Sequence, residues 1–458
     1  MKSLQAVFDY IDDHFEDMLG DLKKVCSFRS VAGDTSGLSA TREYIAGKMR
    51  DVGLPSRLRP VESGNALVTA ELEGTTENTV LFYNHYDVVE EGKRENWATQ
   101  NPFKAEITDG KIYARGISDN KGPLLSRIHA VQAILAVDGK LPARVKFLVE
   151  GDEETSSPSM SRFAEENSEE FRALTKADVC VWENGRKDES GHPWARFGVR
   201  GSCGFDLRVT TAKTDTHGRM GATIPSAAWR LVWALSTLKG PDERIRIDGF
   251  YDRVIPPTES DYQVLRDFPY EEQAQKEKLG IREYLLGATG EALKRRIYLE
   301  PSLSICGLEA GEVHNGVRGI VPHTAYARIS FYLVADQDPA ELSGLLRRHF
   351  DKHGFPDVEV AQVGGMNRPV RTPIDIPFRE RLRKAAAQVY EKPMVVELTA
   401  LGGGPAIVIR KAWPEIPVVG FGPGNTNSNH HAPNENLKVQ DYKESIKHVA
   451  ALLYSYES

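Results

Sequence analysis

The chain has 458 residues, which is enough for about two or three domains that each bury a core of their own. Lys and Arg number 58 and Asp and Glu number 65, so the net charge is −7, and this balance argues against nucleic-acid binding. No apolar run approaches the ~20 residues that span a bilayer, and the acidic, amphipathic first segment is unlike a signal peptide. We therefore expect a soluble cytoplasmic protein with no membrane partner.

The four cysteines support the same location. Cys26, Cys180, Cys203 and Cys306 lie far apart in the chain and form no C-x-x-C pair. This spacing argues against both a disulfide framework and a cysteine-ligated zinc site. We expect four reduced thiols in a reducing compartment.

The first part of the chain alternates between helical and β-rich segments. Apolar residues at helical spacing predict helices within residues 4–15 and 44–49. Further along, the pattern predicts strands at 66–72, 79–83, 144–149 and 179–182, and helices at 122–136 and after Ser159. This rhythm is typical of an α/β layer around a largely buried sheet.

The pattern changes near Trp194. A half-exposed strand is expected within 198–212 and a helix within 224–238, then a polar segment at 251–269, strands at 303–308 and 325–333, and a helix at 340–350. The α/β rhythm returns from Pro373, with a helix at 378–390, a glycine run at 401–404 and a strand at 417–420. We predict an α/β domain of residues 1–193 and 370–458, interrupted by an inserted α+β domain of residues 194–369.

Acidic and imidazole side chains gather at the ends of the predicted strands. His85 and Asp87 follow the strand at 79–83, and residues 150–154 place four carboxylates after the strand at 144–149. Asp119 stands in a glycine-flanked turn before a helix. Each pattern has a simpler interpretation when taken alone, because an H-x-D pair is common, Asp119 could be a helix cap, and an acidic loop could be solvated.

Two more sites of this kind follow. Glu183 comes directly after the strand at 179–182, and His430 and His431 lie in the segment Asn-His-His-Ala-Pro-Asn-Glu at 429–435. Ligands of open α/β sheets bind at the carboxyl ends of the strands. Five such sites fit a carboxylate and imidazole cage for two divalent metals of the zinc, manganese or cobalt type.

These residues match a known family. The sequence resembles the M20 metallopeptidases and, within them, the carnosinase-like dipeptidases, over nearly the whole chain. The resemblance is carried by NHYDVV at 84–89, W-x-T-x-x-P-F at 97–103, GKIYARGISDNKGP at 110–123, EGDEETSSPS at 150–159, GFYDRV at 249–254 and PSLSICGLE at 301–309. It implies a dinuclear α/β/α catalytic domain with an inserted lid or dimerisation domain.

The resemblance also implies five metal ligands. His85 and Glu183 would bind one ion, and His431 and Glu154 would bind the other. Asp119 would bridge the two ions.

Three neighbouring residues take other roles by the same resemblance. Glu153 matches the family's general base, which must stay uncoordinated to accept a proton. Asp87 matches the carboxylate that orients His85. His430 competes with His431 for the ligand role, and His431 is preferred because it occupies the first position of the family's H-x-x-N-E.

The inserted domain matches the family's lid, through which its members form homodimers. His217 stands where the family has a histidine that reaches the partner subunit's site and stabilises the oxyanion. The alternative is an exposed loop histidine. The helix within 224–238 matches the lid helix at the interface.

Two departures from the family pattern concern substrate recognition. Tyr332 stands where the family has an arginine that grips the substrate carboxylate, and tyrosine cannot make a charged bidentate contact. Gly404 lies in a Gly-Gly-Gly-Pro run where carnosinase-like members have a serine. Arg318 and Arg368 are candidate replacements for the missing arginine.

The sequence therefore predicts a two-metal hydrolase in which a metal-bridging water activated by Glu153 attacks the amide bond of a dipeptide or short peptide. Zinc is expected, with manganese or cobalt as alternatives. An N-acyl-amino-acid deacylase and a short-peptide carboxypeptidase use the same metal site and remain alternatives. A catalytically silent scaffold subunit would have lost the base or a ligand, and a simple binding module would not need a free glutamate beside a ligand.

Overall fold

The computed structural model describes residues 3–312, 316, 318–402 and 404–457, which form two compact units. Unit 1 contains residues 1–198, 371–399 and 405–458, and unit 2 contains residues 199–370 and 400–404. The sequence pattern predicts the first boundary after residue 193, but β9 (Pro193–Arg196) pairs within the sheet of unit 1. Trp194 therefore belongs to unit 1.

Ten strands of the described residues form the central sheet of unit 1, in the order β1-β2-β6-β3-β7-β19-β9-β8-β20, with β18 paired to β9. The four central strands β6, β3, β7 and β19 run parallel to one another. Their bounds are β1 (Ser56–Arg59), β2 (Leu67–Leu72), β3 (Thr79–His85), β6 (Arg144–Glu150), β7 (Val179–Trp182), β8 (Arg186–Lys187), β9 (Pro193–Arg196), β18 (Val395–Glu397), β19 (Val418–Gly420) and β20 (Gly424–Asn425).

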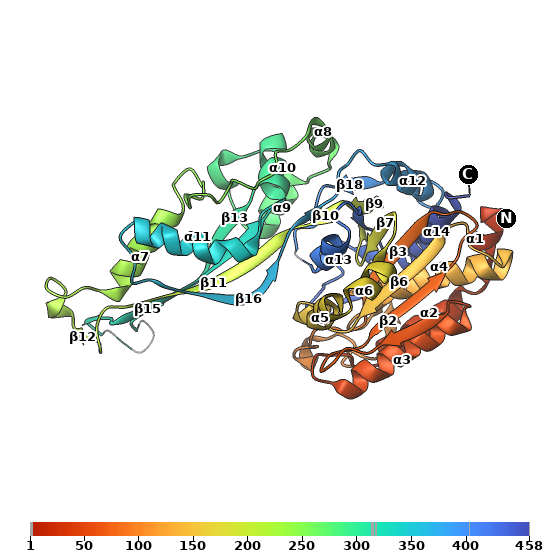
Figure 1. The fold of residues 1–458 in the computed structure, drawn as a ribbon, viewed down its shortest axis with the longest axis horizontal. Coiled ribbons are helices and arrows are strands. Elements are labelled where there is room, and N and C mark those ends of the chain that lie inside the picture. Colours follow the sequence, from red (N-terminus) through yellow and green to blue (C-terminus); the bar gives the residue numbers. More distant parts are fainter. Residues whose placement is uncertain (1–2, 313–315, 317, 403, 458) are drawn as a thin grey trace. The chain divides into compact units, whose positions relative to one another are not determined.

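Helices cover both faces of this sheet (Figure 1). Phe147 and Lys146 are neighbours on β6, so their side chains point to opposite faces. Phe147 packs against Phe82, over whose ring lies Arg127 of α4 (Lys121–Asp138), whereas Lys146 donates to the carbonyl of Ala173 in α6 (Ser168–Thr175). The two helices therefore lie on different sides, as an α/β/α layer requires.

The other helices of unit 1 pack onto these two. α1, α2, α12 and α14 join α4 or each other, and α5 and α13 join α6. The bounds are α1 (Leu4–Asp13), α2 (Phe15–Cys26), α3 (Thr35–Asp51), α5 (Pro158–Glu166), α12 (Pro377–Ala386), α13 (Ala406–Ala412) and α14 (Val439–Tyr454). A further sheet joins β4 (Glu106–Thr108), β5 (Lys111–Tyr113) and β21 (Asn436–Lys438).

Unit 2 is built on a four-stranded antiparallel sheet in the order β13-β15-β11-β16. Its strands are β11 (Gly201–Thr210), β13 (Ser302–Ala310), β15 (Thr324–Leu333) and β16 (Glu359–Asn367). Alternate residues of β11 and β15 are buried in one core with α7 (Ala227–Leu238) and α11 (Pro339–Lys352). Helices cover one face of the sheet, as the alternating pattern predicted.

Shorter elements complete unit 2. They are β12 (Thr216–His217), β14 (Ile320–Val321), α8 (Glu259–Asp267), α9 (Glu272–Leu279) and α10 (Gly290–Leu299). β10 (Gly198–Val199) and β17 (Val370–Arg371) pair where the chain passes between the units. The predicted mixed α/β class is confirmed, whereas β16, α9, α10 and α14 were not predicted.

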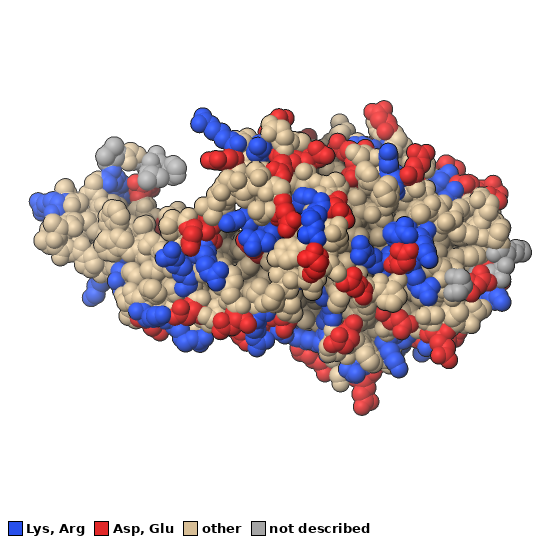
Figure 2. Space-filling model, turned by 90° about the horizontal axis from the view of Figure 1, so that it is seen from above, with Lys and Arg blue, Asp and Glu red and all other residues tan. Residues whose placement is uncertain are grey.

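The surface and the cysteines add two observations. Acidic and basic side chains are interspersed over the face shown in Figure 2. Cys26, Cys180 and Cys203 are buried free thiols, and Cys306 is an exposed one. Within the described part of the chain, no helix combines the length and the apolar character needed to cross a membrane.

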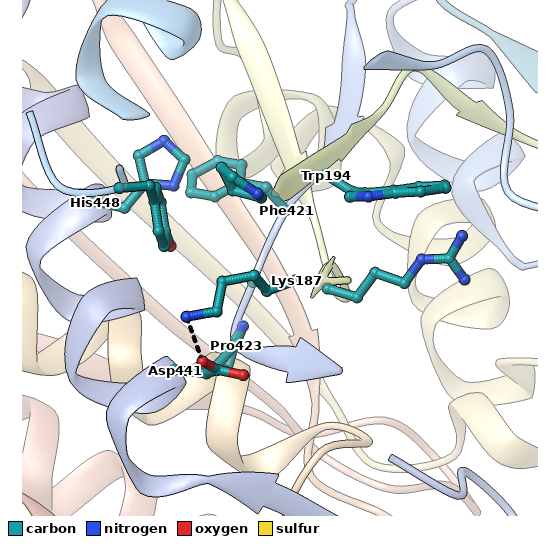
Figure 3. Close-up of a pocket in the computed structure, with 10 residues that line it drawn as sticks. Lys187, Trp194, Phe421, Pro423, Asp441 and His448 are labelled. Atoms are coloured by element: carbon teal, nitrogen blue, oxygen red, sulfur yellow. Dashed lines mark ion pairs between the residues drawn. The ribbon is translucent and has the colours of Figure 1, made fainter. Parts of the chain in front are cut away.

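A small cavity lies where α14 packs against the sheet of unit 1 (Figure 3). Lys187 and Asp441 form an ion pair of 2.6 Å beside it, and Phe421 and His448 also line it. Its volume is about 10 Å³, which is room for about one water. This cavity is therefore too small for a substrate.

Candidate metal centre

The predicted acidic and imidazole residues meet at one edge of the central sheet. β3 runs parallel to both β6 and β7, so the carboxyl ends of the three strands lie side by side. His85 is the last residue of β3, Glu183 follows β7, and Glu153 and Glu154 follow β6 on a short 3₁₀ turn. The fold thus assembles side chains from distant segments, as the strand-end pattern predicted.

His85 lies at the centre of the first group. Its Nε2 is 3.1 Å from Asp119 Oδ1 and 3.7 Å from Glu183 Oε2. Its Nδ1 is 3.1 Å from the carbonyl oxygen of Asp87 and 3.4 Å from Asp87 Oδ1. Asp87 therefore contacts the ring nitrogen that faces away from the cluster, which is how an orienting carboxylate acts on a histidine ligand.

His431 lies at the centre of the second group. Its Nε2 is 3.0 Å from Glu154 Oε2 and 3.6 Å from Asp119 Oδ2. Asp119 therefore turns one carboxylate oxygen toward each imidazole, which is the arrangement a bridging ligand needs. His430 also approaches Asp119 Oδ2, at 3.5 Å through Nδ1, while its Nε2 lies 2.8 Å from Ser118 Oγ.

Glu153 completes the cluster. Potential ligand atoms of His85, Glu153 and Glu183 lie within 4.8 Å of one another, as do those of His85, Asp119 and Glu154. Glu153 is thus close enough to exchange a proton with a group held beside His85.

The electrostatics show that the cluster is rich in negative charge. Burial and the neighbouring Glu183 carboxylate raise the pKa of Glu153 well above its usual range, and burial raises the pKa of Glu183 to about 7 although His85 opposes this rise. Hydrogen bonds to Asp119 and Glu154 raise the pKa of His431 to about 10. Negative charges on carboxylates that lie close together repel one another, and a nearby cation offsets this repulsion.

The donor set fits two divalent ions. Glu154 Oε1 and Glu183 Oε2 are buried and have no hydrogen-bond partner among the described residues. A buried carboxylate oxygen without a partner is costly. Imidazole nitrogens and carboxylate oxygens are the ligands that zinc and similar ions prefer, so two ions would satisfy these atoms.

Glu435 holds the turn that carries Asp119. Its carboxylate accepts hydrogen bonds from the backbone N–H groups of Gly116, Ser118 and Asp119, at 2.8–2.9 Å, and from Arg115 Nη1 at 2.8 Å. Glu435 is fully buried. The pairing of β21 with β5 brings the segment after His431 to this turn. Glu435 is part of the sequence motif at 429–435, but the sequence does not indicate that it holds this turn.

Arg127 and two asparagines also position the cluster, and the sequence analysis missed all three. Arg127 Nη2 donates to the carbonyl of Glu183 at 3.0 Å, and Nη1 donates to that of Tyr83 at 2.6 Å, so one guanidinium joins the ends of β7 and β3. Asn184 Nδ2 donates to Asp119 Oδ1 at 2.9 Å, and Asn120 Nδ2 donates to Asn184 Oδ1 at 2.6 Å. Arg127 and Asn120 are buried and Asn184 is half-buried, and the three residues show no periodic pattern in the sequence.

Glu150 and Asp152 are not solvated residues of an acidic loop. Both are buried, and Glu150 Oε1 accepts hydrogen bonds from Tyr83 Oη at 2.5 Å and Ser157 Oγ at 2.8 Å. Ser159 Oγ donates to Asp152. These contacts shape the segment that presents Glu153 and Glu154.

The residues that the sequence predicts to act in substrate recognition and oxyanion binding lie in unit 2. Their surroundings are described within that unit. His217 is exposed on β12, where its Nδ1 accepts a hydrogen bond from the backbone N–H of Arg219 at 3.2 Å. Tyr332 is 41% exposed on β15. Arg368 forms an ion pair of 3.3 Å with Asp338. In the glycine run, Gly403 lies outside the described residues, and Gly404 belongs to unit 2.

The site residues lie in a segment of the chain that matches a known protein family. Residues 81–455 match the peptidase family M20/M25/M40. The chain belongs to this family. The match contains all of the cluster residues, so this M20 chain has its acidic and imidazole cage within the matched segment.

Similar proteins and similar solved structures support the same family assignment. The chain is 27% identical to the human Beta-Ala-His dipeptidase over 98% of this chain and 92% of that protein. It is 25% identical to the Cys-Gly metallodipeptidase DUG1 of Saccharomyces cerevisiae over 99% and 98%. Its fold matches the M20 family metallo-carboxypeptidase Sso-CP2 of Sulfolobus solfataricus, with a TM-score of 0.85 and 30% identity over 96% of this chain and 99% of that one. The chain is thus an M20 metallopeptidase.

Proposed function

We propose that this protein is a metal-dependent dipeptidase. The single observation that carries the proposal is the cage at the sheet edge, in which Asp119 turns one oxygen toward His85 and the other toward His431 while Glu153 lies alongside. Two similar full-length relatives are named as dipeptidases, which supports dipeptides as the substrate class.

The contacts support a division of the ligands into two groups. His85 and Glu183 would hold one divalent ion, His431 and Glu154 the other, and Asp119 would bridge them. Zinc is the proposed metal, with manganese or cobalt as alternatives, because all three accept mixed nitrogen and oxygen ligands.

Bound ions of this type lower the pKa of water and polarise an amide carbonyl. Glu153 would accept a proton from the attacking water and then deliver it to the leaving amine. Asp87 would keep the His85 ring oriented through its Nδ1 contact.

A homodimer through unit 2 forms part of the proposal. On α7, the stacked rings of Trp229 and Trp233 are 61% and 54% exposed, and β13, an edge strand among the described residues, exposes Ile305 and Leu308. Exposed apolar side chains on an edge strand and on a helix are typical of surfaces that a partner covers. His217 of one subunit would then donate to the oxyanion in the site of the other.

An alternative substrate class has support of its own. Sso-CP2 is named a metallo-carboxypeptidase and is 30% identical to this chain, so cleavage of longer peptides from the carboxyl end is the second candidate. An N-acyl-amino-acid deacylase would use the same residues. A silent scaffold is disfavoured because the base and the five ligands are all retained. The cytoplasmic location stays a prediction.

A substrate panel tests these choices. The metal-loaded protein should be assayed against dipeptides, longer peptides with free carboxyl ends, and N-acyl amino acids, with chelator-treated protein as the control. We expect the highest kcat/KM on dipeptides and no turnover in chelator. Faster cleavage of longer peptides or of N-acyl amino acids would replace the dipeptidase assignment by the corresponding alternative.

A further inference from the structure

Four polar side chains of unit 1 form one continuous row of hydrogen bonds that ends on Asp119. Arg127 Nη1 donates to Asn84 Oδ1 at 2.6 Å, and Asn84 Nδ2 donates to Asn120 Oδ1. Asn120 Nδ2 donates to Asn184 Oδ1 at 2.6 Å, and Asn184 Nδ2 donates to Asp119 Oδ1 at 2.9 Å. We call these four side chains the relay. Three of them are buried and Asn184 is half-buried.

The direction of the relay is fixed at both of its ends. A guanidinium group can only donate, so Arg127 requires the oxygen of the Asn84 amide to face it. A carboxylate that binds metal can only accept, so Asp119 requires the nitrogen of the Asn184 amide to face it. Both ends therefore impose the same orientation on all three amides. Every N–H group of the row points toward Asp119, and no junction brings two oxygens together.

Arg127 places a buried positive charge at the start of the relay. Its side chain is 1% exposed, and its other hydrogen bonds go to backbone carbonyls at the ends of β3 and β7. Within the described part of the chain it forms no ion pair with a carboxylate. Hydrogen bonds in series polarise one another, so a cation at the start of the row strengthens the last bond, which is the one to Asp119.

The relay ends on the oxygen of Asp119 that faces His85. Asp119 Oδ1 lies 3.1 Å from His85 Nε2, whereas Oδ2 faces His431 at 3.6 Å. The bond from Asn184 to Oδ1 limits rotation of the carboxylate, so each oxygen keeps its direction. A carboxylate that bridges two ions needs this orientation, because rotation about its Cβ–Cγ bond would turn an oxygen away from one of them.

We propose that the relay positions Asp119 as the bridging ligand, and that Asn84, which is not a ligand of the proposed cage, thereby sets the affinity of the cage for metal. The inference rests on the proposed two-metal function and deepens it. The relay residues are positioning residues, because each acts on the ions through Asp119. Hydrogen-bond partners of metal ligands typically change metal affinity by about 10- to 100-fold.

Asn84→Asp tests the relay at the junction farthest from Asp119 that can be altered without removing Arg127. The new side chain has nearly the same shape and still accepts from Arg127, but it presents an oxygen to Asn120 in place of an N–H group. One junction of the row must then bring two oxygens together. The affinity for Zn²⁺, measured by competition with a chromophoric chelator, should fall about tenfold or more. A simple charge effect would have the opposite sign, because added negative charge attracts a cation.

Asn184→Leu tests the last bond of the relay. It removes the donor to Asp119 with little change in side-chain size, and it should lower the affinity for Zn²⁺ about 10- to 100-fold. The double variant Asn84→Asp/Asn184→Leu should bind Zn²⁺ no more weakly than Asn184→Leu alone, because a row that is cut at its last bond cannot transmit a change at its first. Losses caused by two independent packing defects would add instead.

Asn78→Asp is the matched control. Asn78 directly precedes β3, so it lies at the opposite end of that strand from Asn84, and its Nδ2 donates to Thr76 Oγ1 at 3.2 Å. The same isosteric change at this position should leave the affinity for Zn²⁺ unchanged. Urea unfolding of each metal-free variant measures folding separately from metal binding.

The outcomes separate the relay from the metal centre. If the wild type binds two Zn²⁺ ions and Asn84→Asp binds them at least as tightly, or if the losses of the two single variants add, the relay is wrong while the proposed metal centre stands. If the wild type binds no Zn²⁺, the proposed function fails and the relay fails with it. If Asn84→Asp does not fold, Asn84→Ala takes its place. It removes the first amide without reversing the row, so a loss of about threefold or more is expected, and an unchanged affinity would overturn the proposal.

Discussion

Tyr332 offers a test of recognition at the scale of one residue. It is 41% exposed on β15, where the family resemblance predicts an arginine that grips the substrate carboxylate. We predict that Tyr332→Arg raises the ratio of kcat/KM for a dipeptide over its amide by about ten- to a hundredfold, because an arginine adds a charged bidentate contact worth ~1.5 to 3 kcal/mol. Rates on the two substrates measure this ratio.

Tyr332→Gln is the control for this prediction. Glutamine has similar reach without charge, so it should leave the ratio close to that of the wild type. An unchanged ratio in Tyr332→Arg would contradict the assignment of this position to carboxylate recognition.

The sequence identified the residues of the cage better than those that support it. His85, Glu183 and Glu154 could be found because each follows a buried strand, and parallel strands bring such positions together. Arg127 could not be found, because a single arginine within an apolar helix is also compatible with an exposed position. Its buried bonds to strand-end carbonyls depend on how α4 packs on the sheet.

At the scale of elements, the burial of His448 predicts that the packing of α14 becomes less stable as the pH falls. It is buried beside Phe421 and Tyr390, and burial lowers its pKa to about 4, from 6.5 when unfolded. Between these two pKa values the His448 ring is protonated in the unfolded state but neutral in the folded state. The stability that the buried, neutral ring contributes is therefore complete above pH 6.5 and is lost as the pH falls toward 4. The loss should be about 2 kcal/mol between pH 7.5 and 5.

Urea unfolding of the wild type and His448→Gln at both pH values measures this effect. The variant should lose less stability on acidification than the wild type, by about that amount. Equal losses in the wild type and His448→Gln would show that His448 does not resist protonation.

The elements that were predicted are those with strong apolar patterns. β3 is buried along its whole length, and β11 alternates in burial, so both were visible in the sequence. β16 is mostly exposed or half-buried, and no residue of α9 is buried, so neither shows an apolar pattern. The first half of α14 is rich in polar residues that pair in the folded state, such as Asp441 with Lys187.

At the scale of the whole molecule, the proposed dimer predicts complementation between subunits. If His217 acts in the partner's site, mixing inactive His217→Ala with inactive Glu153→Gln should restore activity, because one site of each heterodimer then has both residues intact. Random exchange should restore about a quarter of the wild-type rate. Lack of recovery, with exchange shown by differently tagged subunits, would exclude a role for His217 in the partner's site.

The sequence predicts that one unit is inserted into the other, but it does not predict every boundary of the inserted unit. The change from an α/β rhythm to an α+β rhythm marked the inserted segment to within a few residues at both ends. Residues 400–404 also belong to unit 2, although the chain around them belongs to unit 1. Such a return depends on contacts between segments far apart in the sequence, for example the bond from the N–H of Arg200 to the carbonyl of Gly402.

Metal content and dipeptide turnover of Glu153→Gln, measured on the same preparation, test the central claim most directly. Glutamine keeps the shape of the side chain but cannot accept the proton of the attacking water. The account predicts two ions per chain, as in the wild type, with turnover reduced at least ~10²-fold. Full turnover would remove Glu153 from the mechanism, and loss of an ion would show that Glu153 is a ligand instead of the base.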